Sequence, residues 1–333
     1  MRSDRPFARH GARLLAALIL AGAIACGGSD STSPGGDSNT GGSAKPTHPE
    51  GTLGSRITLS SEADGVAIDS SGTAFVAMNY EGAVARFRVD APTPALQPVA
   101  VGNIAQDVVV NRAGTTAYAG SSGKVSFIDV ATGTVTKTVG IPGDIQRLAL
   151  SPDGSRLYAT VSATVYMIPT AGGPVISVPL TSSLFGVTTA PSGNAVYAAG
   201  GGSVWKLDPI TLAVQTKVSP TGPFFGDLVV SLDGKEVYAA QDGGALYVLD
   251  ATTLATVGGV DLKSAPTAMA ITPDGTQLYI ASNSTGKLQV VDRATRAVLK
   301  SIDLGGFPHG IAFDRLGKVA LVTNENGWVD VIR

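Results

Sequence analysis

The chain has 333 residues, of which 44% are hydrophobic and 15% are charged, with 24 basic residues against 26 acidic ones. This balance argues against a nucleic-acid partner, whose phosphates call for clustered lysine and arginine. A single cysteine, Cys26, excludes an intramolecular disulfide, so burial of apolar surface must stabilise the fold.

The first 25 residues have the features of an export signal. Arginines at positions 2, 5, 9 and 13 precede the apolar run 14–25. That run is too short to cross a bilayer of about 30 Å as a helix. We therefore predict a signal peptide over residues 1–25. Its removal takes away four basic residues and one acidic residue, leaving 20 against 25, a formal charge of −5.

Cys26 stands where a bacterial lipoprotein carries its lipid. Ala23-Ile24-Ala25-Cys26 resembles a lipobox, although leucine is usual in place of Ala23. The same residues fit the small-x-small site of ordinary signal peptidase, which would release a secreted protein cut before Cys26. We predict lipidation of Cys26, with the membrane as a partner and the cell envelope as the destination. Gly27, in place of aspartate, favours the outer membrane, on its periplasmic or its surface side.

Residues 26–50 are predicted to be a flexible tether. They are rich in Gly, Ser, Thr, Pro and Asp, and this composition cannot bury enough surface to fold alone. His48 lies inside this segment and is interpreted as a solvated linker residue.

A repeat of about 40 residues fills the rest of the chain. A turn glycine followed by a β-rich stretch recurs at Gly72, Gly114, Gly154, Gly193, Gly234, Gly275 and Gly317, at spacings of 42, 40, 39, 41, 41 and 42 residues. Five of these glycines have a tyrosine four residues later. Because a repeat of this length accommodates four short antiparallel strands, it is typical of a β-propeller blade.

Each repeat has the same internal order. A short apolar inner strand, such as 148–150, leads into an Asp-Gly or Ser-Gly turn, and the second strand carries the tyrosine. The third strand ends in an Asp-x-x-Thr turn, in which the carboxylate is expected to accept backbone N–H bonds. The fourth strand is partly polar, as a solvent-facing edge should be. The Asp-x-x-Thr turns are Asp129/Thr132, Asp208/Thr211, Asp250/Thr253 and Asp292/Thr295.

These patterns predict an all-β fold: a seven-bladed β-propeller with four-stranded antiparallel blades over residues 51–333. The chain ends at the third strand of the seventh repeat. We expect residues 56–60 to supply the missing fourth strand, so that the N-terminal strand closes the last blade and removes an open edge. We expect a monomer.

At the repeat residues the sequence resembles the YVTN (YncE-like) family of β-propellers, in a lipoprotein form. The last repeat carries the resemblance most clearly, in Phe307-Pro308-His309-Gly310-Ile311-Ala312, then Gly317, then Leu321-Val322-Thr323-Asn324. The third repeat departs from the pattern at Ile168-Pro169, and the seventh lacks the tyrosine. NHL-type propellers have similar repeats and remain an alternative.

The inner strands of a propeller begin at one face, where ligands of such folds usually bind. The repeat places seven residues there, eight positions before each glycine: Asp64, Gln106, Gln146, Phe185, Gly226, Thr267 and His309. Asp107, Arg147 and Asp227 follow one position later, and the loops add 79–81, 241–242, 283–284 and 324–326. Asp64, Asp107, Arg147, Asp227, His309 and Asn324 form the candidate ligand-binding face. The alternative is that these residues only form local backbone hydrogen bonds.

No catalytic residue is assigned. His309 is the one histidine of the predicted propeller, and no motif of a hydrolase, zinc protease or nucleotide-binding enzyme is present. We therefore predict a binding or scaffold protein without a cofactor, whose ligand is an envelope protein, a polymer or a small molecule. The alternative is a metal-dependent propeller enzyme resembling gluconolactonase or virginiamycin lyase, with Asp64, Asp107, Asp227, Asn324 and His309 around a divalent metal.

Overall fold

The computed structural model of the chain describes residues 44–220 and 225–333. The predicted signal peptide, Cys26 and the tether as far as residue 43 lie outside the described residues. Residues 44–333 form one unit, whose described part contains 26 β-strands. The described ranges contain no helix with the length and hydrophobicity that a transmembrane segment requires.

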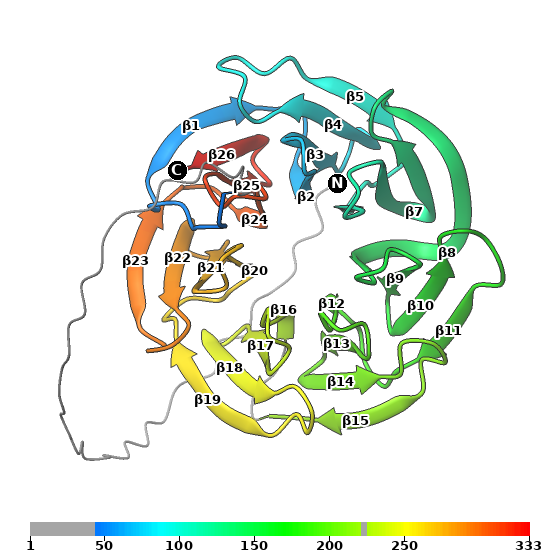
Figure 1. Cartoon of the computed structure of the whole chain (residues 1–333), viewed down its shortest axis with the longest axis vertical. Helices are drawn as coiled ribbons and strands as arrows, with labels where there is room; N and C mark the ends of the chain where they lie inside the picture. The colour runs from blue at the N-terminus through cyan, green and yellow to red at the C-terminus, as the bar shows by residue number, and fades with distance from the viewer. Residues whose placement is uncertain (1–43, 221–224) are drawn as a thin grey trace, which may run out of the picture. The chain divides into compact units, whose positions relative to one another are not determined.

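The strands form antiparallel sheets around a common axis, which confirms the predicted propeller architecture (Figure 1). In five of the six sheets of the described residues the strand order follows the chain, and the turn glycines reverse the first strand of each repeat onto the second. One four-stranded sheet consists of β2 (Ala63–Ile68), β3 (Thr73–Met78), β4 (Ala83–Arg88) and β5 (Gln97–Ala100), and another of β12 (Gly186–Thr189), β13 (Val196–Gly200), β14 (Ser203–Leu207) and β15 (Val214–Val218). A third consists of β16 (Phe225–Val230), β17 (Glu236–Gln241), β18 (Ala245–Asp250) and β19 (Thr256–Asp261). A fourth consists of β20 (Ala268–Ile271), β21 (Gln277–Ser282), β22 (Lys287–Asp292) and β23 (Val298–Asp303).

The described residues form six sheets, so the predicted number of seven separate blades is wrong. The second and third repeats share one six-stranded sheet: β6 (Asp107–Val110), β7 (Thr116–Asp129), β8 (Thr134–Leu150), β9 (Arg156–Val161), β10 (Thr164–Pro169) and β11 (Ile176–Pro179). β7 pairs first with β6 and then with β8, and β8 pairs with β7 as far as Asp144 and with β9 from Ile145. Gly123 and Gly143 have positive φ, which lets these two strands change direction without ending.

The N-terminal strand closes the ring, as predicted. β1 (Leu53–Thr58) pairs with β26 (Trp328–Ile332), which continues to β25 (Ala320–Asn324) and β24 (Pro308–Phe313). Arg56 donates from Nε to Asp330 at 2.7 Å and lies over the Trp328 ring at 4.1 Å. The Asp330 side chain is fully buried, so the contact with Arg56 pairs a charge that would otherwise be costly.

The folded part begins earlier than residue 51, where the sequence places the end of the tether. Thr47 N–H bonds to Leu316, and Pro49 O accepts a bond of 2.9 Å from the Tyr279 hydroxyl. His48, interpreted as a solvated linker residue, contacts Asp274 through Nδ1 at 2.6 Å.

The contact of Pro49 follows a rule of the repeat. Tyr158 donates to Pro209 O, and Tyr197 donates to Ala251 O. In both cases the acceptor follows the aspartate of an Asp-x-x-Thr turn in the next sheet. The last repeat has no such turn, and Pro49 supplies the carbonyl in its place. The N-terminal segment therefore replaces a turn as well as a strand.

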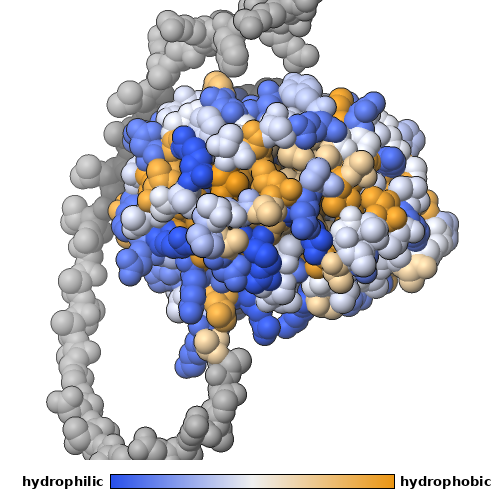
Figure 2. Space-filling view, turned by 90° about the horizontal axis from the view of Figure 1, so that it is seen from above, coloured by the Kyte–Doolittle hydropathy of each residue, from blue (hydrophilic) through white to orange (hydrophobic). Residues whose placement is uncertain are grey.

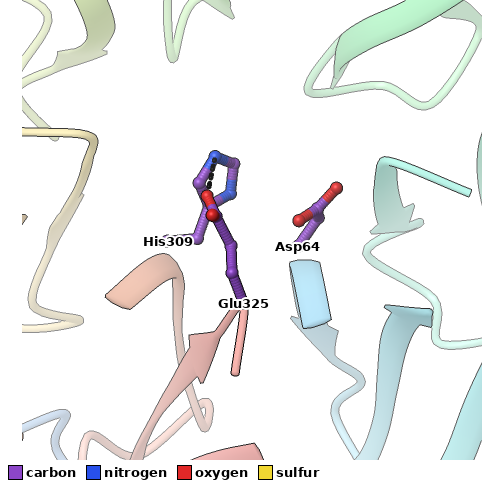
Figure 3. Close-up of side chains that lie close together, drawn as sticks. All are labelled: Asp64, His309 and Glu325. Carbon is purple, nitrogen blue, oxygen red and sulfur yellow. Dashed lines mark ion pairs between the residues drawn. The ribbon is translucent and has the colours of Figure 1, made fainter. Parts of the chain in front are cut away.

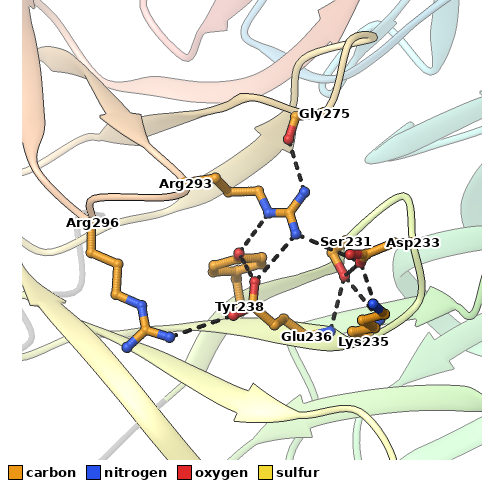
Figure 4. A network of polar contacts seen from close by, with 8 residues as sticks. All are labelled: Ser231, Asp233, Lys235, Glu236, Tyr238, Gly275, Arg293 and Arg296. Atoms are coloured by element: carbon orange, nitrogen blue, oxygen red, sulfur yellow. Dashed lines mark hydrogen bonds and ion pairs between the residues drawn. The ribbon is translucent and has the colours of Figure 1, made fainter. Parts of the chain in front are cut away.

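Tyr238 departs from this rule. In the next sheet the residue that follows the turn aspartate is Arg293, and its side chain contacts the Tyr238 hydroxyl (Figure 4). Arg293 donates to the Tyr238 hydroxyl at 2.8 Å and to Gly275 O at 2.9 Å. Arg293 and Arg296 both pair with Glu236, at 3.3 and 3.4 Å. This network joins the β16–β19 sheet to the β20–β23 sheet.

Apolar side chains fill the space between neighbouring sheets. In one such cluster Phe75 and Val84 of one sheet pack with Ile128 of the next. The outermost strands are largely exposed, as β19 and β23 are. The outer edge accordingly mixes hydrophilic and hydrophobic residues (Figure 2), as expected for solvent-facing strands.

The turn predictions are confirmed at the level of single residues. All seven turn glycines have positive φ, a conformation that favours glycine. In the four Asp-x-x-Thr turns the aspartate accepts the N–H and the hydroxyl of the threonine.

Deletion of residues 51–60 is expected to abolish cooperative unfolding, because it leaves the outer edge of β26 without β1 and buried Asp330 without Arg56. Circular dichroism and thermal melts would compare this variant with a chain that starts at Ala44. A deletion variant that melts cooperatively at the temperature of this control would contradict the closure.

Candidate functional site

A polar pocket lies where the inner strands converge on the axis. It has a volume of about 290 Å³ and is lined by all seven residues that precede the turn glycines by eight positions, from Asp64 to His309, together with Glu62, Asn79, Arg147 and Glu325. The geometric prediction that these seven residues gather on one face is therefore confirmed.

Close contact between two inner strands brings Asp64 to His309. Asp64 is the second residue of β2, and His309 is the second residue of β24. Gly310 N–H donates to the Thr323 hydroxyl at 2.7 Å, and this hydroxyl donates to the Asp64 carbonyl. A Cβ at Gly310 would lie 2.4 Å from that carbonyl oxygen, so glycine is required for this approach.

Asp64, His309 and Glu325 form a compact cluster, in which one ligand-type atom of each residue lies within 4.8 Å of the others. Figure 3 shows the Glu325 carboxylate next to the imidazole of His309, with the Asp64 carboxylate on the other side of the gap. His309 Nε2 lies 3.7 Å from Glu325 Oε1. Asp64 is 5% exposed, and the side chains of His309 and Glu325 are 20% and 33% exposed. The cluster is thus sheltered but reachable from the pocket.

Two buried polar atoms of this pocket have no hydrogen-bond partner. They are Nδ1 of His309 and Oδ1 of Asn79. Asn79 uses its other amide atom, Nδ2, to donate to Asp64 at 2.8 Å. Buried polar atoms are normally paired, so these two atoms are available to a ligand.

The charges of the cluster are mutually unfavourable. Burial, and to a lesser extent the charges of Glu325 and Glu62, raise the pKa of Asp64 to about 7, although Arg147 opposes the shift. Burial likewise raises the pKa of Glu325 and of Glu62. Burial and the positive charge of Arg147 lower the pKa of His309 to about 3, which makes the imidazole neutral at physiological pH.

Asp107 and Asp227, both expected on the ligand-binding face, do not line this pocket. Asp107 accepts N–H bonds from Val108 and from Leu148, at 2.9 and 2.7 Å. Asp227 accepts them from Leu228 and from Met269, both at 2.8 Å. Each aspartate therefore joins its own inner strand to the next inner strand, which is a structural role.

Asn324 is also used by the fold. Its Oδ1 accepts the N–H groups of Phe307 and Asn326, and its Nδ2 donates to Gly305 O. Glu325, the next residue, takes the place in the pocket that was expected for Asn324. The ligand set of the enzyme alternative is therefore not assembled, since only Asp64 and His309 of its five residues meet.

Arg147 is the cationic residue among those that line the pocket. Its Nη1 donates to the Gln146 carbonyl at 3.1 Å, and the Gln146 amide donates to Gln106 at 3.1 Å. The pocket thus offers one guanidinium and two linked amides beside the acidic cluster.

No protein-family model matches the sequence, and no curated protein matches it. Solved structures do match its fold. A chain of a mitotic checkpoint complex superposes with a TM-score of 0.78 at 12% identity, covering 89% of this chain and 96% of that chain. The β-propeller domain of Myceliophteria thermophila Cps50 (Swd1) superposes with a TM-score of 0.74 at 12% identity, covering 84% and 98%. The fold is that of a β-propeller. At this identity the likeness shows the fold alone.

Replacement of Asp227 by alanine is expected to lower the free energy of unfolding by about 2–4 kcal/mol, because two buried N–H groups lose their acceptor. Urea denaturation would measure it, with Asp242→Asn as the control, since Asp242 is an exposed acid. Equal stability of the two variants would argue against the structural role of Asp227.

Asp64→Asn is expected to stabilise the protein, in contrast to the replacement of Asp227. Its melting temperature at pH 8, in the presence of a chelator, should be higher than that of the unchanged chain. When folding raises the pKa of an aspartate, the free energy of unfolding falls as the pH rises between two values. The lower value is the pKa in the unfolded chain, about 4, and the upper value is the pKa in the folded protein. For Asp64 the folded value is about 7. The gain should therefore shrink at pH 5. A gain independent of pH, or a loss at pH 8, would refute this electrostatic account.

Proposed function

We propose that the protein is an exported, lipid-anchored β-propeller of the cell envelope that binds a small polar ligand in its central pocket. The observation that carries the proposal is the pocket itself: all seven repeats contribute a residue to one volume, five of them a polar one, and two buried polar atoms of the pocket lack partners. Propellers offer a rigid surface for such binding, and function lies in the site rather than in the fold.

The size and composition of the pocket define the ligand class. A volume of about 290 Å³ is at the lower end of the range for small-molecule sites. Arg147 would pair with an anionic or carbonyl group of the ligand, and the amides of Gln106 and Gln146 would bind hydroxyl or amide groups. The Phe185 ring would contact an apolar part. A small solute, or one polar side chain of a partner, fits this description.

Binding is favoured over catalysis because most residues that catalysis would need serve the fold. Asp107 and Asp227 join inner strands, and Asn324 holds a loop. His309 has no hydroxyl or thiol nucleophile among its polar contacts in the described ranges. We therefore propose a binding protein, related to the YVTN propellers that its repeats resemble.

The anchor is proposed from the sequence of the leader and from Cys26. Lipid at this residue would place the propeller at the envelope, on the outer membrane, at the end of the segment that precedes Thr47. A secreted form cut before Cys26 is the competing product.

Expression of the full chain and of Cys26→Ser tests the anchor. Mass spectrometry of the mature N-terminus should find a diacylglyceryl-modified Cys26 in the membrane fraction, and Cys26→Ser should carry no lipid. An unmodified N-terminus in the culture medium would refute the anchor but not the pocket.

Ligand capture tests the pocket. The purified propeller, residues 44–333, would be equilibrated with the dialysable fraction of an envelope extract, washed and denatured, and the released molecules identified by mass spectrometry. We expect a compound that Arg147→Gln reduces at least tenfold and that the matched control Arg112→Gln, at an exposed arginine outside the pocket, retains. No captured compound, or equal capture by both variants, would contradict the proposed function.

A further inference from the structure

We propose that Asp64, His309 and Glu325 hold a divalent transition-metal ion, of which Zn²⁺ is the representative. The inference rests on the proposed function, because it assigns part of the ligand-binding pocket to an ion.

The three side chains are close enough to share one ion. Their ligand-type atoms lie within 4.8 Å of one another, whereas the ligand atoms of a tetrahedral zinc site lie about 3.4 Å apart. Side-chain rotations that move each ligand atom by about 1 Å would bring the atoms to that separation. Figure 3 shows the three side chains gathered around one gap. The strands that carry the residues are held in place by the Gly310 contact described above.

Two unpartnered polar atoms of the pocket give separate support for cation binding. His309 Nδ1 and Asn79 Oδ1 are both buried without a hydrogen bond. An amide oxygen can only accept a hydrogen bond or bind a cation, and a neutral imidazole offers one lone pair. Asp107 and Asp227, by contrast, have their oxygens satisfied by N–H groups. The lack of partners is therefore not a general property of the inner strands.

The charge of the pocket also fits a divalent ion. When ionised, Asp64, Glu325 and Glu62 contribute three negative charges, and Arg147 contributes one positive charge. The sum of −2 is balanced by one divalent ion. A bound ion would thus remove the repulsion that now opposes ionisation of the buried carboxylates.

The donor set selects the class of metal. Imidazole nitrogen suits zinc, iron, nickel and copper, whereas calcium and magnesium prefer oxygen donors alone. One imidazole and two carboxylates therefore favour Zn²⁺ over Ca²⁺. Three protein donors leave the fourth position of a tetrahedral site for an oxygen of the pocket ligand, which Arg147 could bind at the same time.

Isothermal titration of the untagged, chelator-treated propeller, residues 44–333, tests the inference. We expect one Zn²⁺ per chain, a higher melting temperature with Zn²⁺, and at least tenfold weaker binding of Ca²⁺. His309→Ala and the isosteric Glu325→Gln should each weaken Zn²⁺ binding at least tenfold while circular dichroism stays unchanged. His48→Ala is the matched control, because His48 is the other histidine of the described ranges and lies on the surface beside Asp274.

The results separate this inference from the proposed function. Absence of Zn²⁺ binding, or binding that His48→Ala abolishes and His309→Ala does not, would overturn the metal site. Capture of a compound that depends on Arg147 would then still support the pocket. Stoichiometric Zn²⁺ binding lost in Glu325→Gln would support the metal site even if no compound were captured.

Discussion

The whole structure depends on the pairing of β1 with β26. A sheet in a propeller buries both faces against its neighbours, so a ring with one gap would expose two apolar faces and an unpaired strand edge at once. The chain avoids this outcome by joining its two ends in one sheet. The contact of Arg56 with buried Asp330, and the carbonyl that Pro49 offers to Tyr279, reinforce the joint.

Closure also explains why the site lies where it does. The joint brings the sheet of β24–β26 against β2, and the contact between Gly310 and the Asp64 carbonyl sets their separation. Asp64 comes from one side of this contact, and His309 and Glu325 come from the other. The acidic cluster therefore forms only when the ring is closed, which couples the site to the integrity of the fold.

Much of this could be predicted from glycine spacing. The spacing located the turns, and counting back eight residues found the seven positions that line the pocket. The next position was misjudged, because side chains alternate along a strand: Asp107 and Asp227 turn away from the pocket and accept N–H groups of the next strand. Arg147 stands at the same position, but its longer side chain reaches the pocket.

Other differences arise from features that the residue pattern does not encode. Gly123 and Gly143 let β7 and β8 continue where the strands were expected to end. Two repeats therefore share one sheet, and the described residues form six sheets in place of the seven blades predicted. Residues 47–50 have a linker composition, yet their backbone and His48 contact the propeller. Glu325 was one of three polar residues in a loop, and only the geometry distinguished it from Asn324.

Asp64, His309 and Glu325 are proposed to bind a ligand, whereas the neighbouring aspartates Asp107 and Asp227 stabilise the fold. Anomalous diffraction at the zinc edge, from a crystal of the propeller grown with Zn²⁺, tests this claim most directly. We expect an anomalous peak among the Asp64, His309 and Glu325 side chains, with Asp107 and Asp227 still bonded to backbone N–H groups. A crystal whose only zinc peaks lie elsewhere, with His309 Nδ1 hydrogen-bonded within the protein, would contradict it.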